Sequence, residues 1–238
     1  MNKGNLLYEG KAKKIFSTNE PEYYWVEYKD SATAFNGEKK EDFIGKGALN
    51  NKITSLIFSR LSEAKIPNHF ERQISETEQI VKKVTIIPVE LVVRNIVAGS
   101  LSKRLGITEG NKIEKPIIEF YYKNDDLGDP LINEDHIKML NLANDEIICK
   151  MKSLAHSINS VLQDLFSESS VNLVDFKLEF GLTTTGNLIL ADEISPDTCR
   201  LWDKETGEKL DKDVFRRGIG KLTDAYEEIL KRLGGAHV

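Results

Sequence analysis

The sequence contains little cysteine and no long apolar run. Among its 238 residues there are two cysteines, Cys149 and Cys199, and their separation fits neither a metal-binding nor a redox motif. We therefore expect two free thiols in a reducing compartment, with a disulfide as the less favoured alternative. No stretch approaches the roughly 18 apolar residues of a membrane span, and residues 1–5 lack the apolar core of a secretory signal. We expect a cytoplasmic protein without a membrane partner.

An excess of positive charge is also absent. The 33 Lys and Arg residues are outnumbered by 38 Asp and Glu residues, so the net charge is −5 and the isoelectric point about 5.6. A chain of this charge has no general attraction for nucleic acids or anionic membranes. Nucleic acid is therefore not an expected partner, and any site for an anion must be a local one.

The common nucleotide-binding motifs are missing as well. The sequence contains neither the Gly-x4-Gly-Lys-Ser/Thr loop nor the Gly-x-Gly-x-x-Gly fingerprint of dinucleotide sites. It also lacks the His-Arg-Asp and Asp-Phe-Gly runs of protein kinases. A kinase would share a lobed cleft, a lysine-rich loop and paired metal-binding acids, but the absence of both runs argues against one.

The most informative segment that is present runs from Leu173 to Gly181. Alternate side chains of a strand point to opposite faces. One face would carry charges and the other would be apolar, the first comprising Asp175, Lys177 and Glu179 and the second Val174, Phe176, Leu178 and Phe180. The pattern predicts a reactive face backed by a core face.

A Thr-Thr-Thr-Gly-Asn turn follows this strand. A hairpin centred between Thr185 and Gly186 would place Glu179 opposite Asp192. Like charges in that position repel each other, so the pair favours a bound cation, and Mg²⁺ is the natural candidate for paired oxygen ligands. The alternative is a solvated strand face covered by ordinary salt bridges.

Basic residues near the start form a candidate phosphate loop. Gly10 is followed by Lys11, Ala12 and Lys13 where we expect one strand to turn into the next. Backbone N–H groups and ammonium groups in such a turn can approach a polyphosphate. Taken alone, a solvated surface loop is the more common fate of such a sequence.

A second candidate anion site lies around Arg94. This arginine stands in an apolar strand, where an unpaired guanidinium would be costly, so it should contact a carboxylate or a phosphate. Gly99 and Ser100 resemble a tight turn into a short helix, and a helix N-terminus with basic neighbours suits a phosphate. The alternative is an internal Arg94–Glu90 ion pair with Ser100 as a helix cap.

The periodicity of apolar residues predicts two lobes with a site in the cleft between them. Residues 1–85 are strand-rich and contain one helix between Gly47 and Lys65. Residues 86–238 are more helical, with a helix capped by Asn144 and a last helix from Ile219 to Leu233. The expected strands cover residues 6–16, 23–28, 69–74, 79–85 and 89–96.

Two of these segments, Ile86 to Ser100 and Leu173 to Gly181, resemble the signature motifs of the SAICAR synthetase family of purine biosynthesis. Further similarity follows in the same order along the chain at Gly10 to Lys13, Gly45 to Gly47, Asn50 to Lys52, Lys123 to Asp125, Asp129 to Pro130, Ser195 to Asp197 and Arg200 to Asp203. The resemblance therefore covers essentially the whole chain. It departs from the family at Asn36, where some relatives have Asp.

The resemblance implies a two-lobed α+β fold, similar to the ATP-grasp and protein-kinase architectures, with ATP in the cleft. It implies a ligase that joins L-aspartate to the carboxylate of the ribonucleotide CAIR through an acyl phosphate, giving SAICAR, ADP and phosphate, with Mg²⁺ as cofactor. A homodimer is usual among the bacterial relatives. The remaining alternative is a nucleotide-binding scaffold without turnover, and the acid–lysine–acid strand argues against it.

The resemblance also implies roles for individual residues. ATP would be bound by Gly10, Lys11, Ala12, Lys13, Lys82, Val84 and Ile86, and Mg²⁺ by Glu179 and Asp192. The substrates would be bound by Arg94, Ser100, Lys123, Asn124, Asp129 and Arg200, while Asp175 and Lys177 would face the reacting centre.

No role is expected for the histidines. His69, His136, His156 and His237 have no metal-ligand spacing, and we expect them to be structural or exposed. Cys199 has no histidine near it in sequence and is not expected to be a nucleophile.

Overall fold

The computed structural model describes residues 1–34 and 39–234, so Asn36 lies outside the described residues. The first part of the chain forms β1 (Lys3–Glu9), β2 (Lys13–Thr18), β3 (Tyr23–Tyr28), β4 (Ser31–Ala34), β5 (Lys39–Asp42), α1 (Lys46–Glu63), β6 (Phe70–Gln73) and β7 (Glu78–Lys82). The middle forms β8 (Thr85–Ile96), α2 (Gly99–Leu105), β9 (Lys112–Tyr122), a 3-10 turn (Asp125–Leu127), β10 (Leu131–Ile132) and α3 (Glu134–Met139). The last part forms α4 (Asp145–Glu168), β11 (Val171–Leu182), β12 (Leu188–Ala191), β13 (Cys199–Asp203), α5 (Asp213–Arg217) and α6 (Leu222–Arg232).

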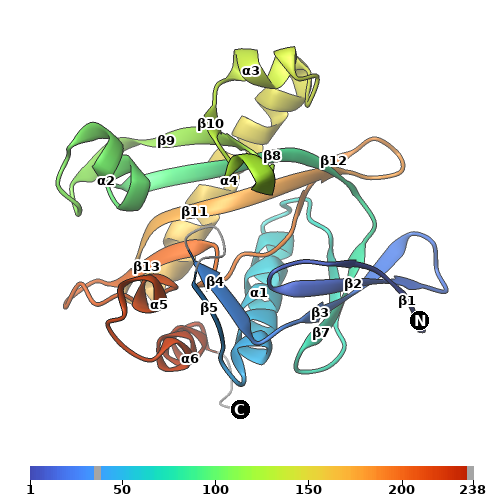
Figure 1. Ribbon diagram of the computed structural model, residues 1–238, viewed down its shortest axis with the longest axis horizontal. Coiled ribbons are helices and arrows are strands. Elements are labelled where there is room, and N and C mark those ends of the chain that lie inside the picture. The colour runs from blue at the N-terminus through green and yellow to red at the C-terminus, as the bar shows by residue number, and fades with distance from the viewer. Residues whose placement is uncertain (35–38, 235–238) are drawn as a thin grey trace.

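The strands form two antiparallel sheets and a separate β4–β5 hairpin. The first sheet has the order β1-β2-β3-β7-β6, and the second has the order β10-β9-β8-β11-β12 with β13 also paired to β11. In Figure 1 the first sheet lies at the lower right and the second runs across the upper part of the molecule. The chain passes from one sheet to the other between Lys82 and Thr85.

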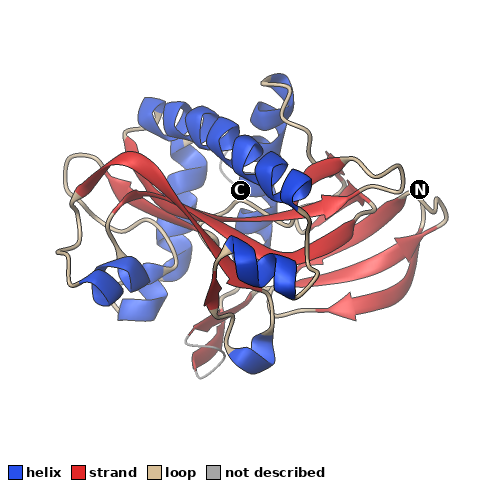
Figure 2. Cartoon of the chain, turned by 90° about the horizontal axis from the view of Figure 1, so that it is seen from above, coloured by secondary structure: helices blue, strands red, loops and turns tan. Residues whose placement is uncertain are grey.

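Helices cover one face of the second sheet and leave its other face to the cavity described below. The long helix α4 crosses the sheet (Figure 2) and packs against β11. Asn144 caps it as predicted, because its side chain accepts a hydrogen bond of 2.9 Å from the backbone N–H of Ile147. The apolar stripe of α4 and the core side of β11 are thereby removed from water.

Helix α1 joins the two parts of the molecule in one core. Its buried Ile53 and Ile57 belong to the same apolar cluster as Phe176 of β11 and Tyr226 of α6. A helix that comes from the strand-rich first part of the chain therefore packs against α4 and α6 of the second part as well as against its own strands β3, β6 and β7. The division into lobes 1–85 and 86–238 stays a prediction.

Several expectations for single elements need correction. The last helix begins at Leu222, so Ile219, which was expected within it, lies before the helix and is 58% exposed. Strand β8 begins at Thr85 rather than Val89. Strand β9 was not predicted, because its Lys, Glu and Pro residues give little of the apolar alternation that indicates a strand.

The core face of β11 differs from the prediction at one residue. Phe176, Leu178 and Phe180 enter the main core as expected. Val174 instead packs in a small separate cluster with Ala98 and Trp202. The reason is an irregularity in the β11–β13 ladder between Leu173 and Asp175, which shifts the alternation of faces.

Candidate active site

One large cavity of about 910 Å³ lies between the two sheets, and most of the predicted site residues line it. These are Gly10, Lys11, Ala12, Lys13, Lys82, Val84, Ile86, Arg94, Lys123, Asp129, Asp175, Lys177, Glu179, Asp192 and Arg200. Ser100 and Asn124 are not among the lining residues, but each contacts one of them, Arg94 and Asp129 respectively. Residues from distant parts of the sequence therefore converge on one cavity, as a shared site requires.

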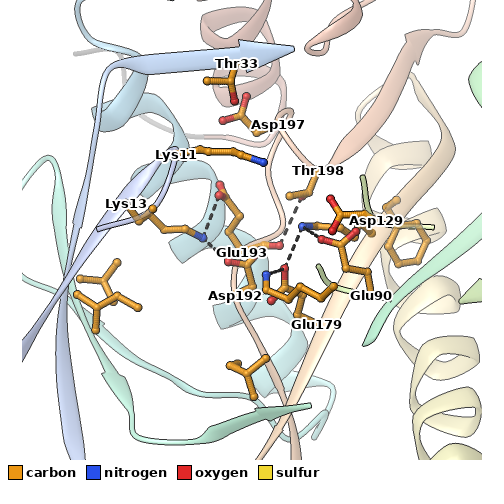
Figure 3. Close-up of a pocket in the computed structure, with 18 of the residues that line it drawn as sticks. Lys11, Lys13, Thr33, Glu90, Asp129, Glu179, Asp192, Glu193, Asp197 and Thr198 are labelled. Carbon is orange, nitrogen blue, oxygen red and sulfur yellow. Dashed lines mark hydrogen bonds and ion pairs between the residues drawn. The ribbon is translucent and has the colours of Figure 1, made fainter. Parts of the chain in front are cut away.

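The turn between β1 and β2 brings two lysines to the cavity. Gly10 closes this turn with a backbone hydrogen bond of 2.8 Å from its N–H to the carbonyl of Lys13. Lys11 forms a 2.7 Å ion pair with Asp125. Figure 3 shows Lys13 reaching two carboxylates on the opposite side, with its Nζ 2.5 Å from Asp192 and 3.0 Å from Glu193.

These contacts keep Lys13 charged. Burial lowers the pKa of Lys13, but the charges of Asp192 and Glu193 outweigh burial, so its pKa lies well above the usual value. The same pair acts on the acid. Burial raises the pKa of Asp192, but the charges of Lys13 and Lys177 lower it by a larger amount, so its pKa lies below the usual value. The pair is therefore ionic at neutral pH.

The predicted pairing of Glu179 with Asp192 across the hairpin is wrong by one residue. Glu179 pairs with Ala191, because residues 183–187 form a five-residue loop and shift the register from the one expected for a centre between Thr185 and Gly186. Asp192 follows the end of β12 and has a left-handed backbone with a φ of 58°. It still faces the cavity, but from the chain after the strand rather than from within the ladder.

The like charge opposite Glu179 is Glu90 of β8. Lys177 lies between them, with its Nζ 2.7 Å from Glu90 and 2.9 Å from Glu179. Lys123 contacts the same Glu179 oxygen, Oε1, at 2.6 Å. Glu179 is only 4% exposed, whereas the side chains of Lys177 and Lys123 are 27% and 42% exposed. The network is therefore partly buried, and Glu179 is not on the solvated face that was the alternative.

Burial also acts on the lysine of this network. It lowers the pKa of Lys177, but the charges of Glu179, Asp192 and Glu90 outweigh it, so the pKa of Lys177 lies well above its usual value. Lys177 is therefore a cation and a hydrogen-bond donor at neutral pH, and its amine is not free to accept a proton.

The carboxylates suit a magnesium ion that phosphates help to hold. Within residues 1–34 and 39–234, Glu179 Oε2 and Asp192 Oδ2 have no hydrogen-bonded partner, whereas Oε1 and Oδ1 are occupied by lysines. No group of three or more potential ligand side chains occurs in the described part of the chain. Mg²⁺ is commonly bound by one or two carboxylates together with substrate phosphates and water, and this pair fits that pattern.

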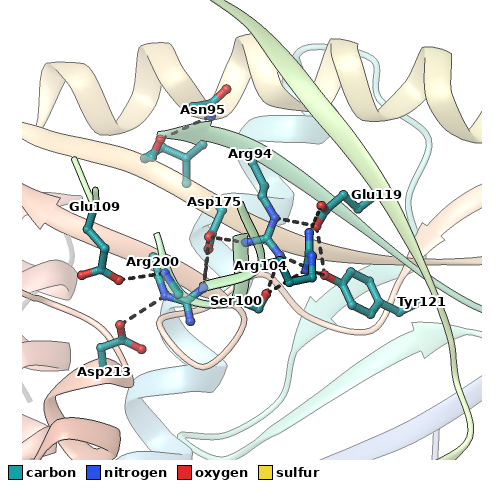
Figure 4. Close-up of polar contacts among 12 residues, drawn as sticks. Arg94, Asn95, Ser100, Arg104, Glu109, Glu119, Tyr121, Asp175, Arg200 and Asp213 are labelled. Atoms are coloured by element: carbon teal, nitrogen blue, oxygen red, sulfur yellow. Dashed lines mark hydrogen bonds and ion pairs between the residues drawn. The ribbon is translucent and has the colours of Figure 1, made fainter. Parts of the chain in front are cut away.

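At the other end of the cavity a buried carboxylate joins two arginines (Figure 4). Asp175 accepts hydrogen bonds of 2.9 Å from Arg94 and 3.0 Å from Arg200. Arg94 also donates to Glu119 at 2.7 Å and to Ser100 at 3.0 Å. The prediction that Arg94 contacts a carboxylate is confirmed. The alternative Arg94–Glu90 pair is wrong, because Glu90 is paired with Lys177.

The arginine cluster extends to α5. Arg200 donates from Nε to Asp213 at 3.1 Å, and Arg216 donates to the same carboxylate at 2.7 Å. Gly99 lies close to the guanidinium of Arg200, since a Cβ at Gly99 would be 2.5 Å from Arg200 Nη2. Glycine is therefore favoured where the first turn of α2 meets Arg200, since Gly99 also has a φ of 53°. Both arginines line the cavity.

The predicted residues Lys123, Asn124 and Asp129 lie in the loop between β9 and β10. Asp129 accepts a 2.9 Å hydrogen bond from the backbone N–H of Asn124, and its φ of 49° is left-handed. Asp129 thus closes the loop through one carboxylate oxygen, while Lys123 extends to Glu179. Asn124 contributes its backbone to the loop.

Some residues of the cavity were missed by the sequence analysis. Glu193 is 4% exposed and pairs with Lys13, and Asp197 binds the fully buried Lys46 at 2.6 Å. His69, expected to be structural or exposed, lines the cavity. Lys46 and Asp197 lay within segments that resembled the family, and Glu193 follows Asp192 directly. The resemblance was thus the available signal for Lys46 and Asp197, adjacency to Asp192 was the signal for Glu193, and no spacing pointed to His69.

The comparisons with known proteins agree with this arrangement. The family model for SAICAR synthetase matches residues 6–233. A phosphoribosylaminoimidazole-succinocarboxamide synthase of Bacillus cereus (strain B4264) is 64% identical over 239 residues, which is 100% of both chains. None of the helices in the described residues is long and apolar enough to span a bilayer.

Solved structures extend the similarity to the fold. The crystal structure of phosphoribosylaminoimidazole-succinocarboxamide synthase from Ehrlichia chaffeensis has a TM-score of 0.96 and 45% identity, covering 98% of this chain and 100% of that one. A SAICAR synthetase in complex with ADP has a TM-score of 0.94 and 48% identity, covering 97% and 98%. The predicted two-lobed α+β fold is confirmed. The chain belongs to the SAICAR synthetase family.

Proposed function

We propose that this protein is an ATP-dependent ligase that joins L-aspartate to the carboxylate of CAIR, giving SAICAR, ADP and phosphate in purine biosynthesis. The observation that carries the proposal is the pairing of two sites in one cavity of a chain that the family model matches over residues 6–233. One site combines lysines with two carboxylates, and the other presents two arginines. A similar structure is a complex with ADP, which supports a nucleotide in the first of these sites.

The reaction needs both sites because a carboxylate does not readily form an amide. The oxide is a poor leaving group, so transfer of the γ-phosphoryl group of ATP to a carboxylate oxygen of CAIR gives an acyl phosphate. The amine of aspartate then attacks the carbonyl carbon, and phosphate leaves. Catalysis of both steps consists mainly of holding the reactants in place and neutralising their charge.

The nucleotide would lie along the β1–β2 turn and the segment between the sheets. Gly10 to Lys13 would cover the phosphates, and Lys82, Val84 and Ile86 would bind the adenine. Glu179 and Asp192 would hold Mg²⁺, which neutralises charge on the phosphate oxygens when it is bound. Among the described residues, the second oxygens of these two carboxylates have no hydrogen-bonded partner, and both acids line the same cavity as Lys13, which supports this placement.

CAIR would lie at the arginine end of the cavity. The planar guanidinium groups of Arg94 and Arg200 suit phosphate and carboxylate oxygens, and Ser100 would add a hydroxyl donor. Asp175 holds both arginines in place, and Lys177 lies between the two ends, where its cationic amine can stabilise charge on the reacting carboxylate. Lys123, Asn124 and Asp129 would help to place aspartate or CAIR.

We further propose that the protein acts as a homodimer in the cytoplasm. The dimer is what the resemblance to the family implies. Both cysteines are free thiols, as a reducing compartment requires.

The test is ADP release by the purified protein with Mg-ATP and CAIR, with and without L-aspartate, together with detection of SAICAR. Turnover that requires all three substrates and yields SAICAR is the expected result. ADP release in the absence of both CAIR and aspartate would indicate a simple ATPase or kinase-like site. Binding of nucleotide without any turnover would indicate a scaffold.

A further inference from the structure

A buried histidine lies behind the candidate magnesium ligands and has no part in the proposed chemistry. His69 is 6% exposed and lines the cavity together with Asp192 and Glu193. Its ring Nε2 is 3.0 Å from the backbone carbonyl oxygen of Asp192. A carbonyl can only accept a hydrogen bond, so the contact requires that Nε2 carry the proton and donate it.

The carbonyl that His69 contacts belongs to the peptide group that joins Asp192 to Glu193. Both acids contact the same ammonium group, with Lys13 Nζ 2.5 Å from Asp192 and 3.0 Å from Glu193. A peptide group is planar and moves as one unit. Rotation of this group would therefore displace the carboxylates on both sides of it.

The backbone at this point needs support from outside its own strand. Strand β12 ends at Ala191, so ladder hydrogen bonds do not hold Asp192. The left-handed φ of 58° at Asp192 is unfavourable for a residue with a Cβ, although Asp tolerates it better than most. The hydrogen bond from His69 satisfies a carbonyl that lies beyond the end of the strand.

His69 is itself held by two backbone contacts and one packing contact. Its N–H donates to the carbonyl of Leu190 in β12 at 2.9 Å, and its carbonyl accepts from the N–H of Lys82 at 2.7 Å. Its ring lies 5.5 Å from the ring of Phe58, which is fully buried. One residue thus connects the end of β12 with the segment between the sheets that is proposed to bind adenine.

We propose that His69 is a positioning residue whose Nε2–H, donated to the Asp192 carbonyl, orients the carboxylates of Asp192 and Glu193 for the magnesium–nucleotide complex. The inference rests on the proposed function, in which Asp192 holds Mg²⁺. In this proposal His69 acts through the Asp192 carbonyl and is not itself a ligand of the metal or the substrates. Its effect should therefore be seen in how much Mg²⁺ strengthens nucleotide binding, and not in nucleotide binding as such.

The experiment compares His69→Gln, His69→Asn and His69→Leu with the unmodified protein. A Gln side chain can bring an amide N–H close to the position of Nε2, whereas the Asn amide is too short and Leu has no donor. The dissociation constant of ADP is measured by calorimetry with Mg²⁺ and with EDTA, and the ratio of the two values gives the enhancement by Mg²⁺. Thermal melting of each variant shows that it is folded.

We expect His69→Gln to keep the enhancement within about 3-fold. His69→Asn and His69→Leu should lose about 10-fold of it, the size expected from leaving one buried carbonyl without a donor, while ADP affinity in EDTA changes by less than about 3-fold. In the metal-free protein, hydrogen exchange over residues 192–195 should be faster in these two variants than in His69→Gln.

An unchanged enhancement in His69→Asn and His69→Leu would overturn the inference, and so would an equal loss of affinity with Mg²⁺ and with EDTA. Should His69→Leu fail to fold, the Gln and Asn variants decide by the same criteria. Asp192→Asn separates the inference from its basis. If Asp192→Asn keeps the enhancement of ADP binding by Mg²⁺, the assignment of Asp192 to the metal is wrong and the inference fails with it. If Asp192→Asn loses the enhancement but the His69 variants keep it, only the inference about His69 is wrong.

Discussion

Ser100 is the predicted substrate-binding residue whose role the geometry tests most sharply. Its hydroxyl accepts a 3.0 Å hydrogen bond from Arg94, yet Ser100 is not among the residues that line the cavity. A hydroxyl that binds an anionic substrate contributes about 1.5–3 kcal/mol, whereas one that only supports a neighbouring arginine contributes less.

We expect Ser100→Ala to raise the KM for CAIR about 10-fold and to leave the KM for ATP unchanged, because the removed hydroxyl would contact CAIR alone. Steady-state kinetics with each substrate varied in turn measures both constants. A rise of less than about 2-fold in the KM for CAIR would mean that Ser100 serves only to hold Arg94.

Asp211 should make stability depend on pH. It is fully buried, and burial together with the charge of Asp213 raises its pKa from 3.8 to about 7. The folded protein therefore binds this proton more tightly than the unfolded chain. The stabilisation is fully present below about pH 4 and is lost as the pH rises towards 7.

In Asp211→Asn this titration is absent, so the free energy of unfolding should fall less between pH 4 and pH 7 than in the unmodified protein. Urea unfolding at several pH values measures the difference, which can reach a few kcal/mol because one pKa unit corresponds to about 1.4 kcal/mol. Parallel curves for the two proteins would show that Asp211 is ionised throughout this range. The quantity to compare is the slope of the free energy of unfolding against pH, because the Asn amide also changes the stability at every pH.

The residues that sequence reasoning placed correctly are those whose chemistry is visible in a short pattern. Arg94 in an apolar strand needed a carboxylate, and it has two. The acid–lysine–acid alternation of β11 placed three charges toward the cavity. His69 was out of reach, because its role depends on the carbonyl of a residue far along the chain, and no side-chain pattern reveals a carbonyl.

At the scale of single elements, the strands of the β11–β12 hairpin could be predicted from the sequence, but their register could not. The period-two alternation predicted β11, because such patterns report directly on burial, and the turn after it predicted β12 as the return strand. The register depends on the conformation of the loop, with Gly186 at a φ of 81° and a hydrogen bond from its N–H to the carbonyl of Thr183. Loop conformation is not encoded in strand patterning, so the predicted register was wrong by one residue.

The central strand β11 also contains a glycine where the segment between the sheets passes close by. A Cβ at Gly181 would be 2.6 Å from Val84 Cγ2 and 2.8 Å from Val84 Cβ. We expect Gly181→Ala to displace Val84 and to weaken ADP binding several-fold, because Val84 is proposed to contact the adenine. Calorimetric titration with ADP measures this.

Gly186→Ala is the matched control, because its Cβ would meet no atom within 4 Å. Its φ of 81° should cost about 1 kcal/mol of stability, with no change in ADP affinity. Equal ADP affinities in the two variants would remove Val84 from the proposed adenine contact.

At the scale of the whole molecule, an exposed ion pair connects two residues that line the cavity from distant parts of the chain. Lys11, from the first sheet, binds Asp125, from the loop after β9, at 2.7 Å, and their side chains are 50% and 68% exposed. Exposed pairs contribute little to stability, about 0–1 kcal/mol. Lys11 is also proposed to bind the phosphates of ATP, so Asp125 competes with the nucleotide for it.

We expect Asp125→Asn to lower the KM for ATP about 2-fold to 3-fold and to leave the melting temperature unchanged. The effect should shrink in high salt, because ions screen exposed charges. Steady-state kinetics at two ionic strengths tests this. A raised KM for ATP in the variant would mean that Asp125 orients Lys11 for the nucleotide instead of competing with it.

The order of strands in the second sheet has a consequence for the growing chain. The apolar strand β8 pairs with β9 on one side and with β11 on the other, and its Thr85 is paired with Leu182. During synthesis, one edge of β8 therefore lacks its partner until Leu182 has left the ribosome. An apolar edge that waits for a distant partner can associate with other chains. The nascent protein should thus be most vulnerable to aggregation while residues 97–182 are being made.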